Sequence, residues 1–325
     1  MHKITCSGRI KSVFYSVMIG YFLLVEGCSP ILAQQERESR KPKTPTVTST
    51  QPPISFTMTP MMDLTPVSGV TLSDFKPGDP HGTPQIIYDQ TCVSTSAEHK
   101  APGGDDYTQG RFERPFDKEM NYLPSLDIVR AELVRSGYGW DYFTIVLEAE
   151  PASSPVVYGL ELDLNIDGRG DFLIQLPAPT SSTWTETGVK MFWDSDGDVG
   201  GRVINRSDPH GYKGSGFESI KIDANAGKTR GQIWSRLISN GLQIAVAENL
   251  TGGKNSKFSW KPYTDGNPFP PTWYDIDDYF TMEQAGSAIV GDLDYPLKAV
   301  YTVDNTCRGL SGLTPSGNEQ GVCPP

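Results

Sequence analysis

Apolar and polar residues alternate along several short runs of this chain, most regularly in residues 156–166, "VVYGLELDLNI". The side chains on one face of this extended run are all apolar: Tyr158, Leu160, Leu162, Leu164 and Ile166. A period of two with one apolar face predicts a half-buried antiparallel β-strand. Runs of similar texture predict further strands at residues 127–135, 141–150, 171–177, 189–194, 218–223, 231–238, 242–248 and 297–303.

Turn residues separate these runs, and little of the chain has the period of an amphipathic helix. One short helix is expected at residues 277–286. About nine or ten short strands with such turns predict an all-β fold, an antiparallel β-sandwich of jelly-roll or immunoglobulin-like layers with long loops. We expect one such domain at residues 69–325, which is large enough to bury a substantial core.

The first 33 residues have the organisation of an export signal. Lys3, Arg9 and Lys11 precede an apolar run at residues 13–25. A basic segment before a short apolar run is typical of a secretory signal peptide. The run is shorter than the roughly 20 apolar residues that a membrane span requires.

Two processing routes stay open after this signal. The sequence "VEGC" resembles a bacterial lipoprotein box with lipidation at Cys28, although Glu26 departs from the usual pattern. Cleavage after Ala33 is the alternative. Residues 34–68 are rich in Thr and Pro and predict a disordered tether. We therefore expect a protein outside the cell or on its surface, which contacts the membrane only through an N-terminal lipid anchor.

The charge balance is acidic, with 28 Lys and Arg against 39 Asp and Glu and a formal net charge of −11. Because binding of nucleic acid requires a basic surface, this balance argues against a nucleic-acid partner. It suits an exported protein that holds cations.

Three cysteines lie beyond the signal, and an oxidising compartment favours disulfides among them. Cys307 and Cys323 are the natural pair and would staple the tail at residues 304–325. Cys92 then remains as a buried thiol, or it is the true partner of either one, and the spacing alone leaves both open.

The hairpin at 127–150, the strand and turn at 156–174 and the later run at 233–250 together resemble extracellular β-sandwiches of the DOMON-like group. The family 9 carbohydrate-binding module is similar to that group. The resemblance covers about residues 120–250 and implies binding of haem or sugar, or an accessory role. Haem-binding members use a Met and a His as axial ligands. No such pair is matched here, where the mature chain retains only His81, His99 and His210.

The stretch "DLNIDGRGDF", residues 163–172, lies between two predicted strands, and its Asp-Gly predicts a tight hairpin turn. Its oxygen-bearing side chains are candidate calcium ligands: Asp163, Asn165, Asp167 and Asp171. The twelfth loop position is Ile174 and not Glu, which excludes a helix–loop–helix calcium site and leaves a β-hairpin variant. The tripeptide Arg169-Gly170-Asp171 resembles an adhesion motif, but we interpret it as a coincidence.

A second acidic turn, "WDSDGDVGG", places Asp194, Asp196 and Asp198 two residues apart. Three carboxylates so close together repel one another without a cation. This turn is therefore the preferred calcium centre. An ordinary solvated turn is the alternative, because Asp and Gly are common turn residues.

Aromatic residues gather between residues 260 and 280 and are candidates for stacking on a sugar. The predicted ligand-binding residues are Trp260, Trp273, Tyr274 and Asp275. Trp184 and Trp193, which flank the second acidic turn, are the second choice. The alternative is that these rings pack a Pro-rich loop onto the sandwich, since large aromatic side chains dominate core burial.

Familiar catalytic motifs are absent from the sequence, including the Gly-x-Ser-x-Gly elbow, the His-Glu-x-x-His zinc pair and the phosphate loop. We therefore predict a calcium-stabilised binding module without catalytic residues, with carbohydrate or a cell-surface glycan as ligand. The alternatives are a secreted glycoside-processing enzyme and a structural cell-surface domain without a small ligand.

Overall fold

The computed structural model describes residues 76–100, 114–136, 138–153, 155–199, 215–273, 291, 293, 302–316 and 322–324. The chain divides into two units, Met1–Thr65 and Pro66–Pro325, and every described residue belongs to the second. The predicted export signal with Cys28, the tether and the helix at 277–286 lie outside the described residues. Most of the strand predicted at 297–303 lies outside them too.

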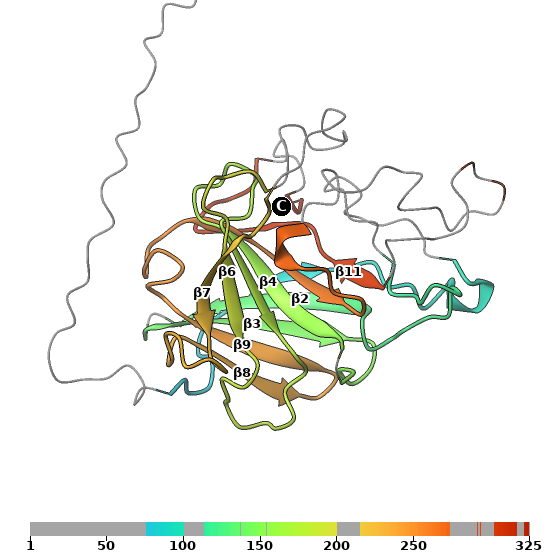
Figure 1. The fold of residues 1–325 in the computed structure, drawn as a ribbon, viewed down its shortest axis with the longest axis horizontal. Helices are drawn as coiled ribbons and strands as arrows, with labels where there is room; N and C mark the ends of the chain where they lie inside the picture. Colours follow the sequence, from blue (N-terminus) through green and yellow to red (C-terminus); the bar gives the residue numbers. More distant parts are fainter. Residues whose placement is uncertain are drawn as a thin grey trace, which may run out of the picture. The chain divides into compact units, whose positions relative to one another are not determined.

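Two antiparallel sheets lie one over the other, as the alternating sequence predicts (Figure 1). Their strands are β1 (Gln85–Tyr88), β2 (Ile128–Arg135), β3 (Trp140–Leu147), β4 (Val157–Asp163), β5 (Phe172–Leu176), β6 (Lys190–Trp193), β7 (Ser219–Asp223), β8 (Ile233–Ile238), β9 (Gly241–Ala247), β10 (Phe258–Asp265), β11 (Val303–Asn305) and β12 (Gly309–Ser311). The five-stranded sheet has the order β1-β2-β3-β9-β8. The seven-stranded sheet has the order β11-β10-β4-β5-β6-β7, and β12 also pairs with β10.

Helical structure in the described residues is limited to two 3₁₀ turns, η2 (Ser96–Glu98) and η4 (Pro271–Trp273). In this part of the chain no helix has the length and apolar character needed to cross a membrane. The fold is therefore an antiparallel β-sandwich, as predicted.

The core lies between the two sheets and draws apolar side chains from both. The predicted apolar face of β4 is confirmed, because Tyr158, Leu160 and Leu162 are each fully buried there. Phe143 and Ile145 of β3 lie in the same cluster from the opposite sheet. The period-two pattern of β4 thus correctly identifies the side chains that face the core.

Strand β10 is central to the larger sheet, although the sequence does not predict it. It pairs with β4 on one side and with β11 and β12 on the other, and all eight of its residues are buried. Pro262 lies opposite Leu160 within this strand. Because proline lacks a backbone N–H, it usually argues against a central strand, and the segment therefore resembled a loop.

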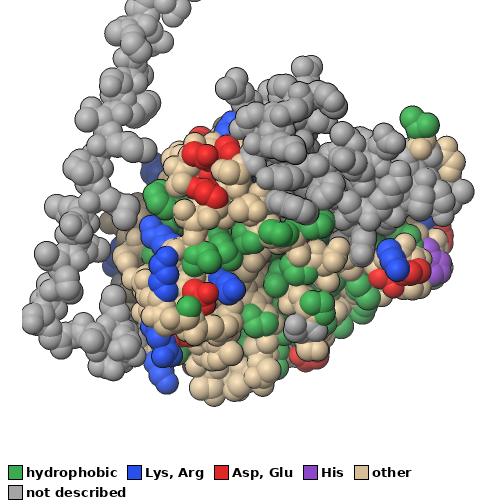
Figure 2. All heavy atoms as spheres, in the orientation of Figure 1, with side chains coloured by type: hydrophobic (Ala, Val, Ile, Leu, Met, Phe, Trp, Pro, Cys, Tyr) green, Lys and Arg blue, Asp and Glu red, His purple; other side chains and the backbone are tan. Residues whose placement is uncertain are grey.

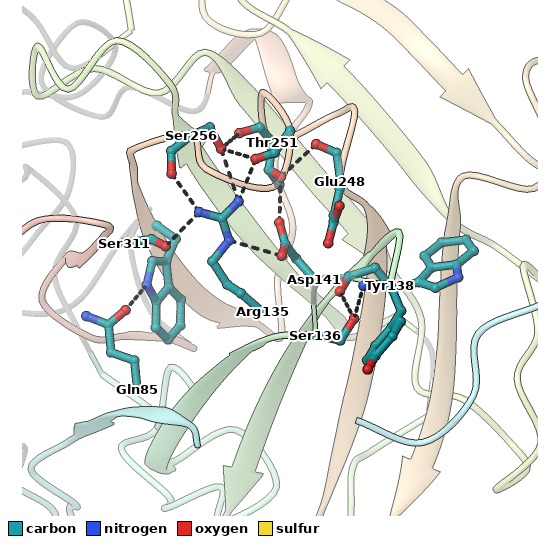
Figure 3. A network of polar contacts seen from close by, with 12 residues as sticks. Gln85, Arg135, Ser136, Tyr138, Asp141, Glu248, Thr251, Ser256 and Ser311 are labelled. Carbon is teal, nitrogen blue, oxygen red and sulfur yellow. Dashed lines mark hydrogen bonds and ion pairs between the residues drawn. The ribbon is translucent and has the colours of Figure 1, made fainter. Parts of the chain in front are cut away.

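Trp260 of β10 lies in the core and does not face solvent, with 1% of its surface exposed. Its ring meets that of Phe143 edge-on, with 5.5 Å between the centroids. Its Nε1 donates to Oε1 of Gln85 at 3.2 Å (Figure 3). Since a ring buried in this way cannot stack on a sugar, the prediction that Trp260 binds ligand is wrong.

A polar network around Arg135 links the two sheets at one end of the sandwich (Figure 3). The Arg135 guanidinium extends from β2 and pairs with buried Asp141 of β3 at 3.1 Å. It also donates to the carbonyl oxygens of Gly253 and Ser256, at 2.7 and 2.6 Å, in the loop before β10. Burial raises the pKa of Asp141, whereas the Thr251 hydroxyl and Arg135 oppose that shift. The network ties β2 and β3 to the β9–β10 loop.

The polar face of β4 is buried, although the alternating pattern predicts a strand with one solvated face. Glu161 is paired with Arg308 at 2.5 Å and with Lys261 at 3.9 Å. Asp163 lies 3.7 Å from the same Arg308 guanidinium. These four charged side chains are each at most 7% exposed. The acidic positions of β4 therefore face a buried ionic cluster.

Cys307 and Cys323 form the predicted disulfide, with 5.1 Å between their Cα atoms. Cys92 is a buried thiol outside this disulfide. The backbone N–H of Cys92 donates to Oδ2 of Asp127 at 2.9 Å. The connectivity that the sequence left open is therefore the one that staples the tail.

Candidate metal centre

The first acidic turn connects β4 to β5, and its side chains close the turn on itself. The Asp163 carboxylate accepts the backbone N–H groups of Ile166 and Gly168, at 2.6 and 3.0 Å. Gly168 has a φ of 89°, which the tight turn requires. The predicted hairpin is therefore confirmed.

The other candidate ligands in this turn accept backbone N–H groups in the same way. Asn165 accepts from Asp167 at 2.9 Å, Asp167 from Arg169 at 2.9 Å, and Asp171 from Leu164 at 2.6 Å. The group of three carboxylates found among the described residues does not include Asp163, Asp167 or Asp171. In this structure the four side chains close the turn, and calcium binding by Asp163, Asn165, Asp167 and Asp171 stays a prediction.

The buried carboxyl group of Asp163 should make the free energy of unfolding depend on pH. Burial raises its pKa to about 6, and the Arg308 charge opposes that shift. An unfolded Asp has a pKa of about 3.9, so the folded state binds more protons between these two values. The free energy of unfolding should therefore fall as pH rises from about 4 to 6, by an amount on the order of 3 kcal/mol from this group.

This dependence can be measured by urea unfolding at pH 4, 5, 6 and 7. Burial also raises the pKa values of Asp171 and Asp194, so the wild-type slope is a sum over several groups. The difference between the wild type and Asp163→Asn isolates the Asp163 contribution. We expect the variant to be less stable but to have a flatter profile, and parallel profiles would contradict the assignment.

The second acidic turn follows β6 and is organised by Asp194. Its Oδ1 accepts the N–H of Gly197 at 2.8 Å, and its Oδ2 accepts that of Val199 at 3.0 Å. Val199 and Phe217 are buried against the outer face of the larger sheet. These anchors hold the two ends of the β6–β7 connection in place.

Asp194 and Asp196 of this turn come together with Glu218, the residue before β7. Ligand atoms of the three side chains all lie within 4.8 Å of one another. Glu218 is not suggested by the spacing of the turn, because it joins the cluster only when β7 pairs with β6. Among the described residues, this is the group of carboxylates suited to a cation.

Asp198 has another role than the one predicted. Its carboxylate accepts the backbone N–H groups of Ser215 and Gly216, at 2.5 and 3.0 Å. It thereby ties the turn to the segment that leads into β7. The three carboxylates that the structure brings together are thus Asp194, Asp196 and Glu218, and ligation by Asp198 stays a prediction.

The negative charges of the cluster are not balanced by a cationic side chain among the ion pairs of the described residues. Burial, aided by the neighbouring Asp198 charge, raises the pKa of Asp194 to about 6, against the effect of its backbone N–H donors. Oε1 of Glu218 accepts from the Ser195 N–H at 2.9 Å, whereas its buried Oε2 has no hydrogen-bond partner in the structure. Arg169 reaches the turn but donates to the Gly197 carbonyl at 2.6 Å. The arrangement leaves carboxylate oxygens able to bind a divalent cation.

Acidic side chains gather over the loops at the top of Figure 1, at one end of the sandwich (Figure 2). Trp193, the residue before Asp194, is 42% exposed there. The Lys221 ammonium lies 5.3 Å from the centroid of that ring. The second-choice ring Trp193 is therefore accessible to solvent on the residue that precedes Asp194.

The other predicted aromatic residues lie elsewhere or outside the described part. Trp184 is on the segment that bridges to β8, away from Trp193 on β6. Trp273 ends η4, of which the backbone is described but the Trp273 side chain is not, and Tyr274 and Asp275 lie outside the described residues. The η4 backbone packs against Gly216, where an added Cβ would lie 2.8 Å from the Pro271 carbonyl oxygen. The segment that leads to Trp273 is thus a neighbour of the acidic loop.

Comparisons of the chain with protein-family models, with curated protein sequences and with solved structures found no match. The resemblance to DOMON-like sandwiches therefore stays a prediction.

Proposed function

We propose that this protein is an exported binding module that calcium stabilises and whose ligand is a carbohydrate. The observation that carries the proposal is the cluster of Asp194, Asp196 and Glu218, in which one buried carboxylate oxygen has no partner. A buried carboxylate without a compensating charge is costly, and a bound cation removes that cost.

The chemistry of the donors favours calcium. The cluster contains carboxylates and no His or Cys, which argues against zinc and copper. Calcium takes about six to eight oxygen ligands in flexible geometry, and carbonyl groups and water can complete such a set. Magnesium is less well suited, because it keeps several waters and is seldom held by protein ligands alone.

The carbohydrate part of the proposal is supported by the surroundings of the cluster. Trp193, the residue before Asp194, offers an exposed aromatic ring, and η4 approaches the segment before β7 through Gly216. Ligand sites commonly combine aromatic surface with a few placed polar groups. A cation bound by Asp194, Asp196 and Glu218 would hold the turn after β6 against the residue before β7.

Thermal unfolding tests the cation site. Millimolar calcium should raise the unfolding midpoint of the EDTA-treated protein, because a ligand that binds only the folded state adds about 2.7 kcal/mol of stability at a hundredfold excess over its dissociation constant. Asp196→Asn and Glu218→Gln should each abolish most of this rise. Both residues are preferable to Asp194, which also organises the turn through its backbone N–H donors.

Asp167→Asn is the matched control, since it removes an exposed carboxylate from the neighbouring turn. It should leave the calcium effect unchanged. Equal calcium stabilisation in all three variants and the wild type would contradict the site. A glycan array probed with and without calcium tests the ligand class, and no binding to any glycan would overturn the carbohydrate assignment while leaving the cation site standing.

A further inference from the structure

A cleft lies beside the connection between β7 and β8, where the edge strands of the two sheets are joined. Its volume is about 640 Å³. Small-ligand sites usually measure roughly 300–1,000 Å³, so a disaccharide-sized molecule fits. The residues that line it and bear on its chemistry are Lys76, Trp184, Glu186, Asn225, Arg230 and Trp234.

The wall that carries Trp184 is held to β8 by paired backbone contacts. Thr185 and Ser235 exchange two backbone hydrogen bonds, at 2.8 and 2.9 Å. The Trp184 indole N–H donates to the Gly78 carbonyl at 3.1 Å, and the Arg236 guanidinium lies 4.5 Å from the ring centroid. The cleft is therefore built by the fold and does not depend on one flexible loop.

Positive charge exceeds negative charge in the cleft, although the chain as a whole is acidic. Arg230 pairs with buried Glu186 at 3.2 Å, and its side chain stays 63% exposed. Lys76 is exposed, lies 5.7 Å from the Trp234 ring centroid and forms no ion pair within the described ranges. With two cations and one anion among the lining residues, the local balance favours an anionic ligand.

The remaining polar groups match the hydroxyl groups of a sugar. The Thr185 and Thr187 hydroxyls contact each other at 2.8 Å on the cleft wall. Oδ1 of Asn225 accepts the Gly188 N–H at 3.1 Å, which orients the amide of that side chain. The cleft lining thus combines polar groups with indoles, as expected for a ligand with both polar edges and apolar faces.

We propose that this cleft binds an acidic saccharide, with its carboxylate or sulfate group paired to Lys76 and Arg230 and its ring beside the Trp184 indole. The inference rests on the proposed carbohydrate function and goes beyond it, because it assigns a carbohydrate site other than Trp193 and the acidic cluster and names its ligand class. Guanidinium groups recognise carboxylate and sulfate oxygens well, because their N–H donors match the spacing of those oxygens. Glu186 holds Arg230 in place for this contact.

Calorimetric titration of the purified protein with digalacturonate, a sulfated heparin disaccharide and neutral cellobiose tests the inference. We expect one of the two acidic probes to bind. Binding of digalacturonate would identify a carboxylate as the recognised group, and binding of the heparin disaccharide would identify a sulfate. Arg230→Gln and Lys76→Gln should each weaken that binding tenfold or more, as expected for loss of a charge-assisted contact. Lys254→Gln, which removes an exposed cation outside the cleft, should change it less than twofold.

The possible results separate the cleft from the proposed function. Binding of an acidic probe that survives Arg230→Gln and Lys76→Gln overturns the cleft but leaves the carbohydrate function. Binding of cellobiose alone does the same. If neither these probes nor any glycan on the array binds, the cleft and the carbohydrate assignment both fail, and only the cation site stands. Tryptophan fluorescence of the variants, which should match that of the wild type, shows that they are folded.

Discussion

Replacing Arg308 by Met is expected to lower the free energy of unfolding by about 3–5 kcal/mol, because it leaves two buried carboxylates without their main counter-charge. Arg308 contacts Glu161 at 2.5 Å and Asp163 at 3.7 Å, and all three side chains are nearly inaccessible to solvent. Lys261 remains within 3.9 Å of Glu161 but balances only one of the two negative charges. Urea unfolding at neutral pH measures the loss.

A double substitution tests whether charge is the cause. Adding Glu161→Gln to Arg308→Met removes one of the stranded carboxylates, so it should restore part of the lost stability, and a double-mutant cycle should show coupling. Arg130→Met is the matched control, since Arg130 pairs with Glu132 near the surface. Exposed pairs contribute about 0–1 kcal/mol, so this change should be small. Similar losses for Arg308→Met and Arg130→Met would contradict a buried ionic cluster.

The inward face of β4 could be predicted from the sequence, whereas the burial of its outward face could not. Alternation of Leu160 and Leu162 with acidic residues reports which side chains share a face, and the apolar side is the one that packs. It does not report what covers the other side. Here the outward face is covered by Arg308, which lies more than a hundred residues after β4 in the sequence. The β10–β12 pairing and the disulfide at Cys307 hold the Arg308 segment in place.

In the candidate metal centre, too, the sequence predicts the residues of one turn but not the residue that a distant segment contributes. The turn at Asp194 and Asp196 follows from local spacing, and the sequence alone predicts both residues as ligands. Glu218 joins them only through the register of β6 with β7, which no short motif encodes. Asp198 has the spacing of a ligand but is used by the backbone of Ser215 and Gly216. Side-chain oxygens in turns often satisfy N–H groups, so spacing alone overcounts ligands.

The burial of Trp260 depends on a strand that Pro262 conceals in the sequence. The indole packs directly on β12, where an added Cβ at Gly309 would lie 2.6 Å from the Trp260 Nε1. It also contacts Phe143 of the opposite sheet. A ring that joins two strands and both sheets is part of the core, whereas the sequence alone shows only an aromatic residue near prolines.

Trp260→Ala is therefore expected to destabilise the fold by about 3–5 kcal/mol, the usual cost of removing a large buried aromatic side chain and leaving a cavity. Trp260→Phe keeps more of the packing and should cost less. Trp193→Ala is the control on the surface, because 42% of that side chain is already exposed. Its cost should be below about 1 kcal/mol, within the range of ordinary surface substitutions.

Substitutions of Trp260 and Trp193 should also distinguish an effect on stability from an effect on glycan binding. Denaturant unfolding should report a large effect for Trp260→Ala and a small one for Trp193→Ala. Glycan binding, measured under conditions where each protein is folded, should follow the opposite order if the acidic end of the sandwich is the ligand face. A stable Trp260→Ala protein that has lost glycan binding would return Trp260 to the ligand surface, and β10 would then have to be more open than its buried residues indicate.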